Sequence, residues 1–187
     1  MDVVYAQPLK ELLAVSTYFK EQTVVLVSSE SQEKAAKDAK LIPCFVISTK
    51  TSQSDLQKLS KKKKAVIGSS LAENEFAVKV NADFLLQPSD TKQSFDLGLA
   101  KKCADANVTV VLMFEDFLNA NSFERHLLWK NYLEIVKYCN LKGTKFVVAS
   151  GCKEALHLRA PKVRESLMVL LGVLIVDAKK FLEDEVK

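Results

Sequence analysis

The chain has 187 residues, of which 48% are hydrophobic and 27% are charged, so it is ordinary for a globular protein and can bury roughly 70% of its unfolded surface. Its formal net charge of +4 is mildly basic, which permits a polyanionic partner without requiring one. No charged segment followed by an apolar core begins the chain, and the longest apolar run, residues 167–176, is well short of the roughly 20 residues that cross a bilayer. We predict one cytoplasmic domain over residues 1–187, without a membrane partner.

Short apolar runs rich in β-branched residues recur along the whole chain. They cover residues 2–5, 24–27, 44–47, 65–67, 84–86, 109–113 and 146–149. Each run is almost continuously hydrophobic, which is typical of strands that are buried on both faces of a sheet. The runs therefore predict about seven strands.

Helical patterns lie between the predicted strands. Ser70 and Glu73 form the pattern of a capping box that opens one helix, and the longest helix is expected over residues 122–139. Pro161 suits the first turn of a later helix, and Gly172 suits its end. Regular alternation of strand and helix predicts an α/β fold with parallel strands and helical crossovers. Periodicity alone leaves two architectures open, a barrel that is compact for its class or a doubly wound sheet.

Several kinds of enzyme site are not supported by the residues present. The five glycines have neither the spacing of a dinucleotide-binding loop nor that of a phosphate-binding loop. His126 and His157 are the only histidines, so a metal site would have to consist almost entirely of carboxylates. Glu115 and Asp116 follow a predicted strand, but adjacent carboxylates seldom converge on one substrate atom. Their position favours the start of a helix or a turn.

The four cysteines are expected to be reduced and buried. Cys44, Cys103, Cys139 and Cys152 are far apart in the sequence, contain no CxxC pair, and have no histidine nearby that would complete a zinc site. Trp129 falls within an apolar pattern and is likewise expected in the core.

Two clusters of cations could meet an anion. The segment after the last strand carries Lys153, Arg159 and Arg164 without a nucleophile–base pair, which indicates anion binding; the alternative is an ordinary loop whose arginines face solvent. The run Lys61–Lys64 follows a short predicted helix. It is either a solvated turn favoured by the helix carboxyl end or a set of phosphate contacts.

Four ordered segments in the second half of the chain resemble the family of ribonuclease P protein component 3, the barrel-shaped subunit of archaeal ribonuclease P. The segments are Ser94-Phe95-Asp96 with Leu99-Ala100-Lys101 and Asn107-Val108, then Arg125 with Leu128 and Lys137-Tyr138, then Val147-Val148-Ala149-Ser150-Gly151, and then Leu158-Arg159-Ala160-Pro161 with Leu171-Gly172.

The resemblance implies a TIM-type barrel related to the polymerase-and-histidinol-phosphatase fold, but without the metal-binding histidines of that family. It implies a protein that binds and stabilises the catalytic RNA, which removes the 5′ leader from precursor tRNA and holds the magnesium, while the protein binds no cofactor and is inert alone. Expected partners are the catalytic RNA, precursor tRNA, the small component 2 in a two-plus-two assembly, and the other protein subunits. Expected RNA contacts are Arg125 and Arg159, with Lys130, Lys153 and Arg164 added from charge and location. The alternative is a metal-dependent phosphoesterase of the related barrel family.

Overall fold

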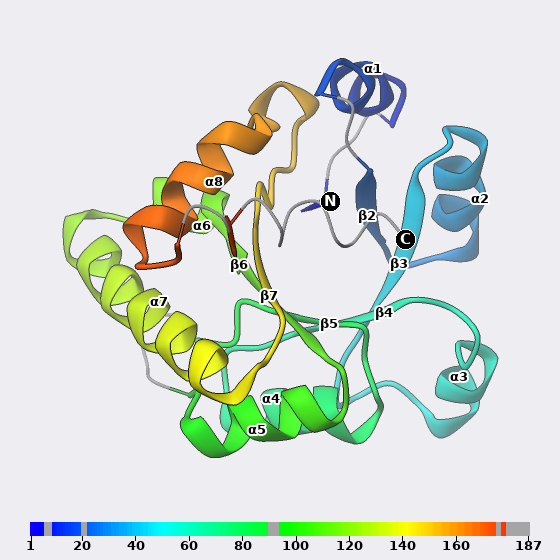
Figure 1. Cartoon of the computed structure of the whole chain (residues 1–187). Helices are drawn as coiled ribbons and strands as arrows, with labels where there is room; N and C mark the ends of the chain where they lie inside the picture. Colours follow the sequence, from blue (N-terminus) through cyan, green and yellow to red (C-terminus); the bar gives the residue numbers. More distant parts are fainter. Residues whose placement is uncertain (6–8, 20–21, 90–93, 175–176, 179–187) are drawn as a thin grey trace.

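The computed structural model describes residues 1–5, 9–19, 22–89, 94–174 and 177–178, in which strands and helices alternate (Figure 1). The strands are β1 (Asp2–Val4), β2 (Thr23–Val27), β3 (Ile42–Ile47), β4 (Lys64–Ile67), β5 (Phe84–Leu86), β6 (Thr109–Met113) and β7 (Phe146–Ala149). The helices are α1 (Leu9–Phe19), α2 (Glu30–Asp38), α3 (Gln53–Lys58), α4 (Leu71–Lys79), α5 (Leu97–Asp105), α6 (Phe114–Asn119), α7 (Ser122–Lys142), the short 3₁₀ helix η1 (Ala155–His157) and α8 (Pro161–Leu170).

The seven strands form one parallel sheet in the order of the sequence, from β1 to β7. The sheet curls until β7 meets β1, where the Gly151 amide donates to the Val3 carbonyl at 3.0 Å and the Tyr5 amide donates to the Cys152 carbonyl at 2.8 Å. The helices lie around the outside of this nearly closed cylinder (Figure 1). The prediction of a compact TIM-type barrel is confirmed, and the doubly wound alternative is wrong.

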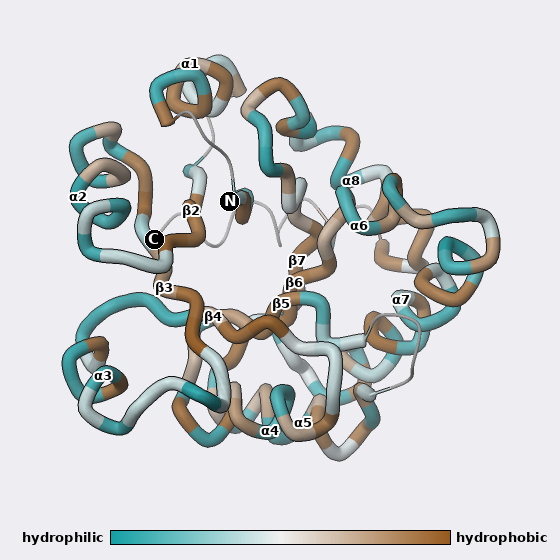
Figure 2. Tube along the Cα trace, turned by 180° about the vertical axis from the view of Figure 1, so that it is seen from behind, coloured by the Kyte–Doolittle hydropathy of each residue, from teal (hydrophilic) through white to brown (hydrophobic). Residues whose placement is uncertain are grey.

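Residues alternate between the barrel interior and the outer layer along each strand. One apolar cluster draws on all seven strands and fills the interior, with Val24, Phe84 and Val147 among its members. Their neighbours Leu85 and Val148 instead pack outward beneath the helices. The strands therefore form a hydrophobic centre, while the helices are of mixed polarity (Figure 2). This two-residue alternation explains why the strands read as continuously apolar, because both faces are covered.

The predicted strands match the observed strands to within two residues at either end, and the long helix extends three residues further than predicted. It ends at Lys142 because Gly143 adopts a left-handed conformation, with φ of 67°. The expected capping interaction at α4 is present in part, since the Ser70 hydroxyl accepts from the Glu73 amide while the Glu73 carboxylate binds the Ser70 hydroxyl. A reciprocal capping box occurs instead at α7, between Asn121 and Glu124. No helix in the described ranges is long and apolar enough to cross a membrane.

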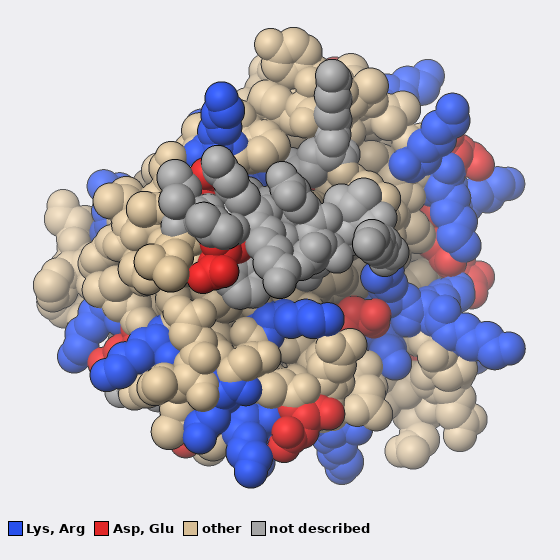
Figure 3. Space-filling model, viewed as in Figure 1, with Lys and Arg blue, Asp and Glu red and all other residues tan. Residues whose placement is uncertain are grey.

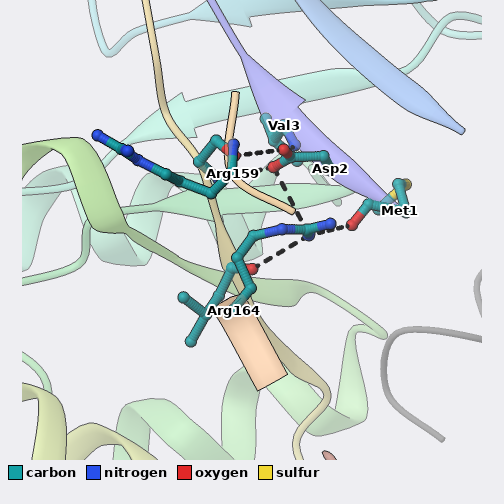
Figure 4. A network of polar contacts seen from close by, with 7 residues as sticks. Met1, Asp2, Val3, Arg159 and Arg164 are labelled. Atoms are coloured by element: carbon teal, nitrogen blue, oxygen red, sulfur yellow. Dashed lines mark hydrogen bonds and ion pairs between the residues drawn. The ribbon is translucent and has the colours of Figure 1, made fainter. Parts of the chain in front are cut away.

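A buried polar network joins the two ends of the sheet (Figure 4). Both carboxylate oxygens of Asp2 accept from Ser150, one from its amide at 2.6 Å and the other from its hydroxyl. The Arg164 guanidinium donates to the Met1 carbonyl at 2.8 Å and lies 3.7 Å from the Asp2 carboxylate. Asp2 and Arg164 are both fully buried. The network therefore links β1, the end of β7 and helix α8, and it supplements the few backbone hydrogen bonds at the barrel seam.

Arg164 corrects one expectation from the sequence, which placed it among the residues that contact RNA. Its side chain is 0% exposed, and it also donates to the Val148 carbonyl at 3.4 Å. A guanidinium enclosed between β1 and β7 is inaccessible to a phosphate on the surface. The sequence signal was misleading because Arg164 lies on the first turns of α8, where charge and loop proximity resemble those of a surface cation.

We predict that Arg164→Ala lowers the free energy of unfolding by about 3–5 kcal/mol, because it leaves the Asp2 carboxylate buried without its cation. Urea denaturation measures the change. Arg159→Ala, which removes a partly exposed side chain from the adjacent loop, is the matched control and should change stability by less than about 1 kcal/mol. Equal stability of the two variants would contradict the assignment of Arg164 to the barrel seam.

Candidate functional site

The loop after β7 is held in place by the barrel seam. Gly151 has φ of +64°, and an added Cβ atom would lie 2.8 Å from the Met113 sulfur, so the turn requires glycine. The loop then runs outward through η1 and returns, where the Arg159 amide donates to the Ser150 hydroxyl at 2.9 Å. Since Asp2 holds Ser150, the backbone of Arg159 is connected directly to the buried network.

The Arg159 guanidinium is positioned over an aromatic ring. Its central carbon lies 5.8 Å from the centroid of the Phe114 ring, at the first residue of α6. The side chain is partly buried, its Nε has no hydrogen-bond partner among the described residues, and Figure 4 shows it pointing away from the seam network. The Nε is buried, whereas the two Nη groups of this restricted guanidinium make no hydrogen bond within the described residues.

Arg125, in the first turn of α7, contacts the other end of α6 through its side chain. Its Nε donates to the Phe117 carbonyl at 3.2 Å, and one Nη donates to the carbonyls of Leu118 and Ala120 at 3.0 and 2.9 Å. Its central carbon is 5.7 Å from the Phe117 ring centroid. Arg125 thus satisfies the free carbonyls at the end of α6, while its side chain stays exposed.

Two arginines therefore lie against helix α6, each beside a phenylalanine. The two phenylalanines are three residues apart in the helix. We call Arg125, Arg159, Phe114 and Phe117 the α6 arginine site. The aromatic rings were not expected from the sequence, in which Phe114 read as the end of a strand. A pair of phenylalanines at helical spacing, directly after a strand, was the available signal, but nothing in the sequence indicated that two distant arginines would reach it.

The two predicted lysine contacts are placed differently. Lys153 is exposed in the loop after β7, close enough to Asp116 to favour its ionised form. Lys130 is exposed on α7, and no contact in the described residues connects it to α6. The structure thus brings Lys153 to the same end of the barrel as Arg159 and leaves Lys130 as a separate surface charge.

Acidic groups lie next to these cations. Glu115 and Asp116 occupy the first turn of α6, as the sequence predicted, and a Glu115 carboxylate oxygen lies 3.3 Å from His157 Nδ1. Burial raises the pKa of Asp116, against the attraction of Lys153, and burial together with Asp116 raises the pKa of Tyr5 to about 12. Within the described ranges, no three His, Cys, Asp or Glu side chains are grouped to hold a metal ion.

The four cysteines are unpaired and buried, as expected. Burial raises the pKa of the Cys103 thiol and of the Cys152 thiol to about 12. The thiolate is therefore disfavoured even at Cys152, which lies in the loop after β7. Trp129 packs against the large outer core, which also confirms its expected position.

Comparison with known proteins identifies the fold. No protein-family model and no curated protein matches the sequence. A chain in the cryo-EM structure of archaeal ribonuclease P with mature tRNA is similar in structure, with a TM-score of 0.80 and 19% identity over 97% of this chain and 86% of that chain. The A. niger ochratoxinase is less similar, with a TM-score of 0.55 and 12% identity over 84% of this chain and 42% of its own. The chain therefore has the α/β barrel fold that both structures contain.

We predict that Asp116→Asn raises the melting temperature at pH 7, because burial makes the ionised carboxylate unfavourable in the folded protein. A raised pKa means that the folded state binds the proton more tightly, so this cost falls as the pH decreases. The advantage of the variant should vanish well below the ordinary value of 3.8, where the carboxyl is protonated in both states.

Thermal melts between pH 3 and pH 7 measure this dependence. Glu154→Gln, at an exposed carboxyl of the neighbouring loop, is the control and should show no such pH-dependent gain. An Asp116→Asn variant that is less stable than the parent at pH 7 would contradict the prediction.

Proposed function

We propose that this chain is a protein subunit of ribonuclease P, corresponding to the family's component 3, and that it acts in tRNA processing by binding the catalytic RNA. The observation that carries the proposal is the similarity to a chain of an archaeal ribonuclease P complex, which extends over 97% of this chain and 86% of that one. The agreement over nearly all of both chains supports a shared role more strongly than a common barrel core alone.

Several of the residues that carry the sequence resemblance lie at one end of the barrel, which supports the proposal. Ser150 and Gly151 form the turn at the seam, Arg159 begins from the same turn, and Arg125 closes α6. Ser94 accepts a hydrogen bond from Asn74 through its carbonyl at 2.9 Å, next to the end of β5. Part of each segment of the family pattern therefore lies near the carboxyl ends of β5 to β7, whereas Asn107-Val108 precede the amino end of β6 and Lys137-Tyr138 lie further along α7.

The α6 arginine site has the chemistry of a phosphate contact. A guanidinium presents paired donors that fit two phosphate oxygens, and restriction by an aromatic ring lowers the entropy lost on binding. Arg159, Arg125 and Lys153 would thus neutralise RNA phosphates from a rigid scaffold. Chemistry would remain with the RNA and the magnesium that the RNA holds. Lys130 is retained as a weaker, peripheral contact.

The proposal extends to partners and assembly. The subunit would associate with component 2 in a two-plus-two arrangement, with the other ribonuclease P proteins, and with precursor tRNA through the complex. The isolated chain would not cleave RNA. These statements follow from the family resemblance together with the fold.

We predict that Arg159→Ala lowers cleavage of precursor tRNA by the reconstituted holoenzyme mainly at low magnesium, with roughly tenfold loss, about 1.4 kcal/mol, there and near-normal activity at high magnesium. The physical reason is that divalent cations can replace one fixed charge in screening phosphate repulsion. Single-turnover cleavage rates across a magnesium titration measure the effect.

Arg159→Lys is the second variant, because it keeps the charge and loses the bidentate geometry. Its cleavage rate at low magnesium should lie between those of Arg159→Ala and the parent. Lys162→Ala, at an exposed residue of the next helix, serves as the control. Identical magnesium profiles for Arg159→Ala and the parent would count against the proposal. Hydrolysis of a generic phosphodiester by the chain with divalent metal and no RNA would favour the phosphoesterase alternative instead.

A further inference from the structure

Seven of the 24 lysines of this chain line hollows around α3, on another side of the barrel from α6 (Figure 1). Three open hollows of about 720, 540 and 400 Å³ surround the helix. The lysines that line them are Lys50, Lys58, Lys61–Lys64 and Lys79, which we call the α3 lysine surface. Figure 3 shows basic side chains gathered on the side of the barrel that carries α2 and α3.

The charge of this surface is large relative to that of the whole chain. Seven lysines and three carboxylates, Glu30, Asp55 and Asp83, line the hollows, which leaves an excess of four positive charges. The whole chain has a formal net charge of +4. Glu33, which pairs with Lys62, lowers this excess to three, so most of the formal net charge of the chain lies around α3.

Most of these lysines are not neutralised within the protein. Lys58 pairs with Asp55 at 3.0 Å, and Lys62 pairs with Glu33 at 2.7 Å. Lys61, Lys63 and Lys64 form no ion pair within the described ranges, although they are consecutive with Lys62. Adjacent like charges repel one another in the folded protein, so a bound polyanion would relieve that repulsion.

The consecutive lysines spread outward instead of converging. Lys62 lies 4.8 Å from the Phe45 ring centroid, on the outer side between α2 and α3, whereas Lys63 lies 5.7 Å from that of Phe84, whose ring belongs to the barrel interior. Lys64 lines the hollow that Lys79 shares on the α4 side. Charges that point in different directions over an open surface fit an extended chain of phosphates and not one small anion.

The remaining lining favours nucleic acid over an acidic protein. Gln53, Gln57 and Asn81 add uncharged amide donors to the largest hollow, and no arginine contributes. Lysines act as point charges without fixed geometry, which suits contacts to a sugar–phosphate backbone that do not depend on base sequence. The run also precedes β4, at the amino end of the sheet, whereas Arg159 follows the carboxyl end of β7.

We propose that the α3 lysine surface is a second RNA-binding surface, which holds the phosphate backbone of a different RNA segment from the one at the α6 arginine site. This inference rests on the proposed function. The barrel then bridges two parts of a folded RNA. The arginines at α6 bind phosphates in a fixed orientation, and the lysines around α3 bind the sugar–phosphate backbone independently of base sequence.

The test compares three full-length variants with the parent for binding to the ribonuclease P RNA of the source organism, titrated with KCl. The first replaces Lys61, Lys63 and Lys64 together with glutamine, and the second replaces the same three with arginine. The third is a matched control that replaces the exposed Lys10, Lys101 and Lys137 with glutamine, so it changes net charge equally.

Each lost phosphate contact should lower the magnitude of the salt slope by about 0.9, so the first variant should lose up to about 2.7 if all three lysines make contacts. The arginine variant should keep the parent slope because charge is preserved, and the control should change little. Far-ultraviolet circular dichroism checks whether the first variant folds. If it does not fold, the arginine variant and the single substitutions Lys61→Gln and Lys64→Gln take its place. Each single substitution is expected to lower the magnitude of the salt slope by about 0.9.

The outcomes separate the two proposals. If the parent binds RNA and the first variant binds with the same slope, the α3 lysine surface is not an RNA contact and the proposed function stands. Equal losses in the first and control variants would mean that only net charge matters, which also overturns the inference. Normal RNA binding with weakened association to component 2 would assign the surface to a protein partner. If the parent neither binds this RNA nor supports cleavage, the proposed function itself fails.

Discussion

The barrel is held closed by a charge contact between the first strand and the last helix. β1 has only three residues, so backbone hydrogen bonds alone offer little at the seam, and Asp2 and Arg164 add a buried network across it. Burying two ions is expensive unless their hydrogen bonds are satisfied. Ser150 and the Met1 carbonyl fulfil that need, so the network connects the two ends of the sheet and is not only a pair of charges.

The same network holds the loop after β7 in place. The Ser150 hydroxyl donates to the Asp2 carboxylate and accepts from the Arg159 amide, so Asp2 fixes the backbone of Arg159 through Ser150. Phe114 then limits where the guanidinium can go. Arg125 is fixed by different means, through the carbonyls at the end of α6. Two cations therefore reach one short helix from opposite ends, each with its direction restricted before any ligand arrives.

Fixed arginines and dispersed lysines provide two different ways to meet a polyanion. At α6 the geometry is restricted and few charges are involved, so orientation and register of a bound phosphate would be set there. Around α3 the charges are numerous and diverge, which suits attraction and retention of a backbone. Acidic neighbours such as Glu115 and Asp116 limit how much negative charge the carboxyl end of the barrel can accept, which focuses binding on the arginines themselves.

Local sequence was sufficient for the secondary structure and for the parallel arrangement of the strands. The two-sided apolar strands, the proline that opens α8 and Gly172 just after that helix are set by contacts within a few residues, and these were predicted closely. The burial of the cysteines and of Trp129 followed from apolar periodicity for the same reason. The loop that carries Arg159 was predicted to bind an anion, because it follows a strand and contains cations without catalytic partners.

Tertiary structure alone decided how each cation is used. Arg164 and Arg159 are five residues apart and look alike in sequence, yet one is enclosed with Asp2 and the other lies on Phe114. That difference depends on Asp2 of β1 and Phe114 of α6, which reach the loop only when the sheet curls. Barrel closure itself is likewise a property of the whole sheet, since the same strand and helix pattern fits an open one. Long-range contacts, which a local pattern does not encode, therefore separate the structural arginine from the exposed one.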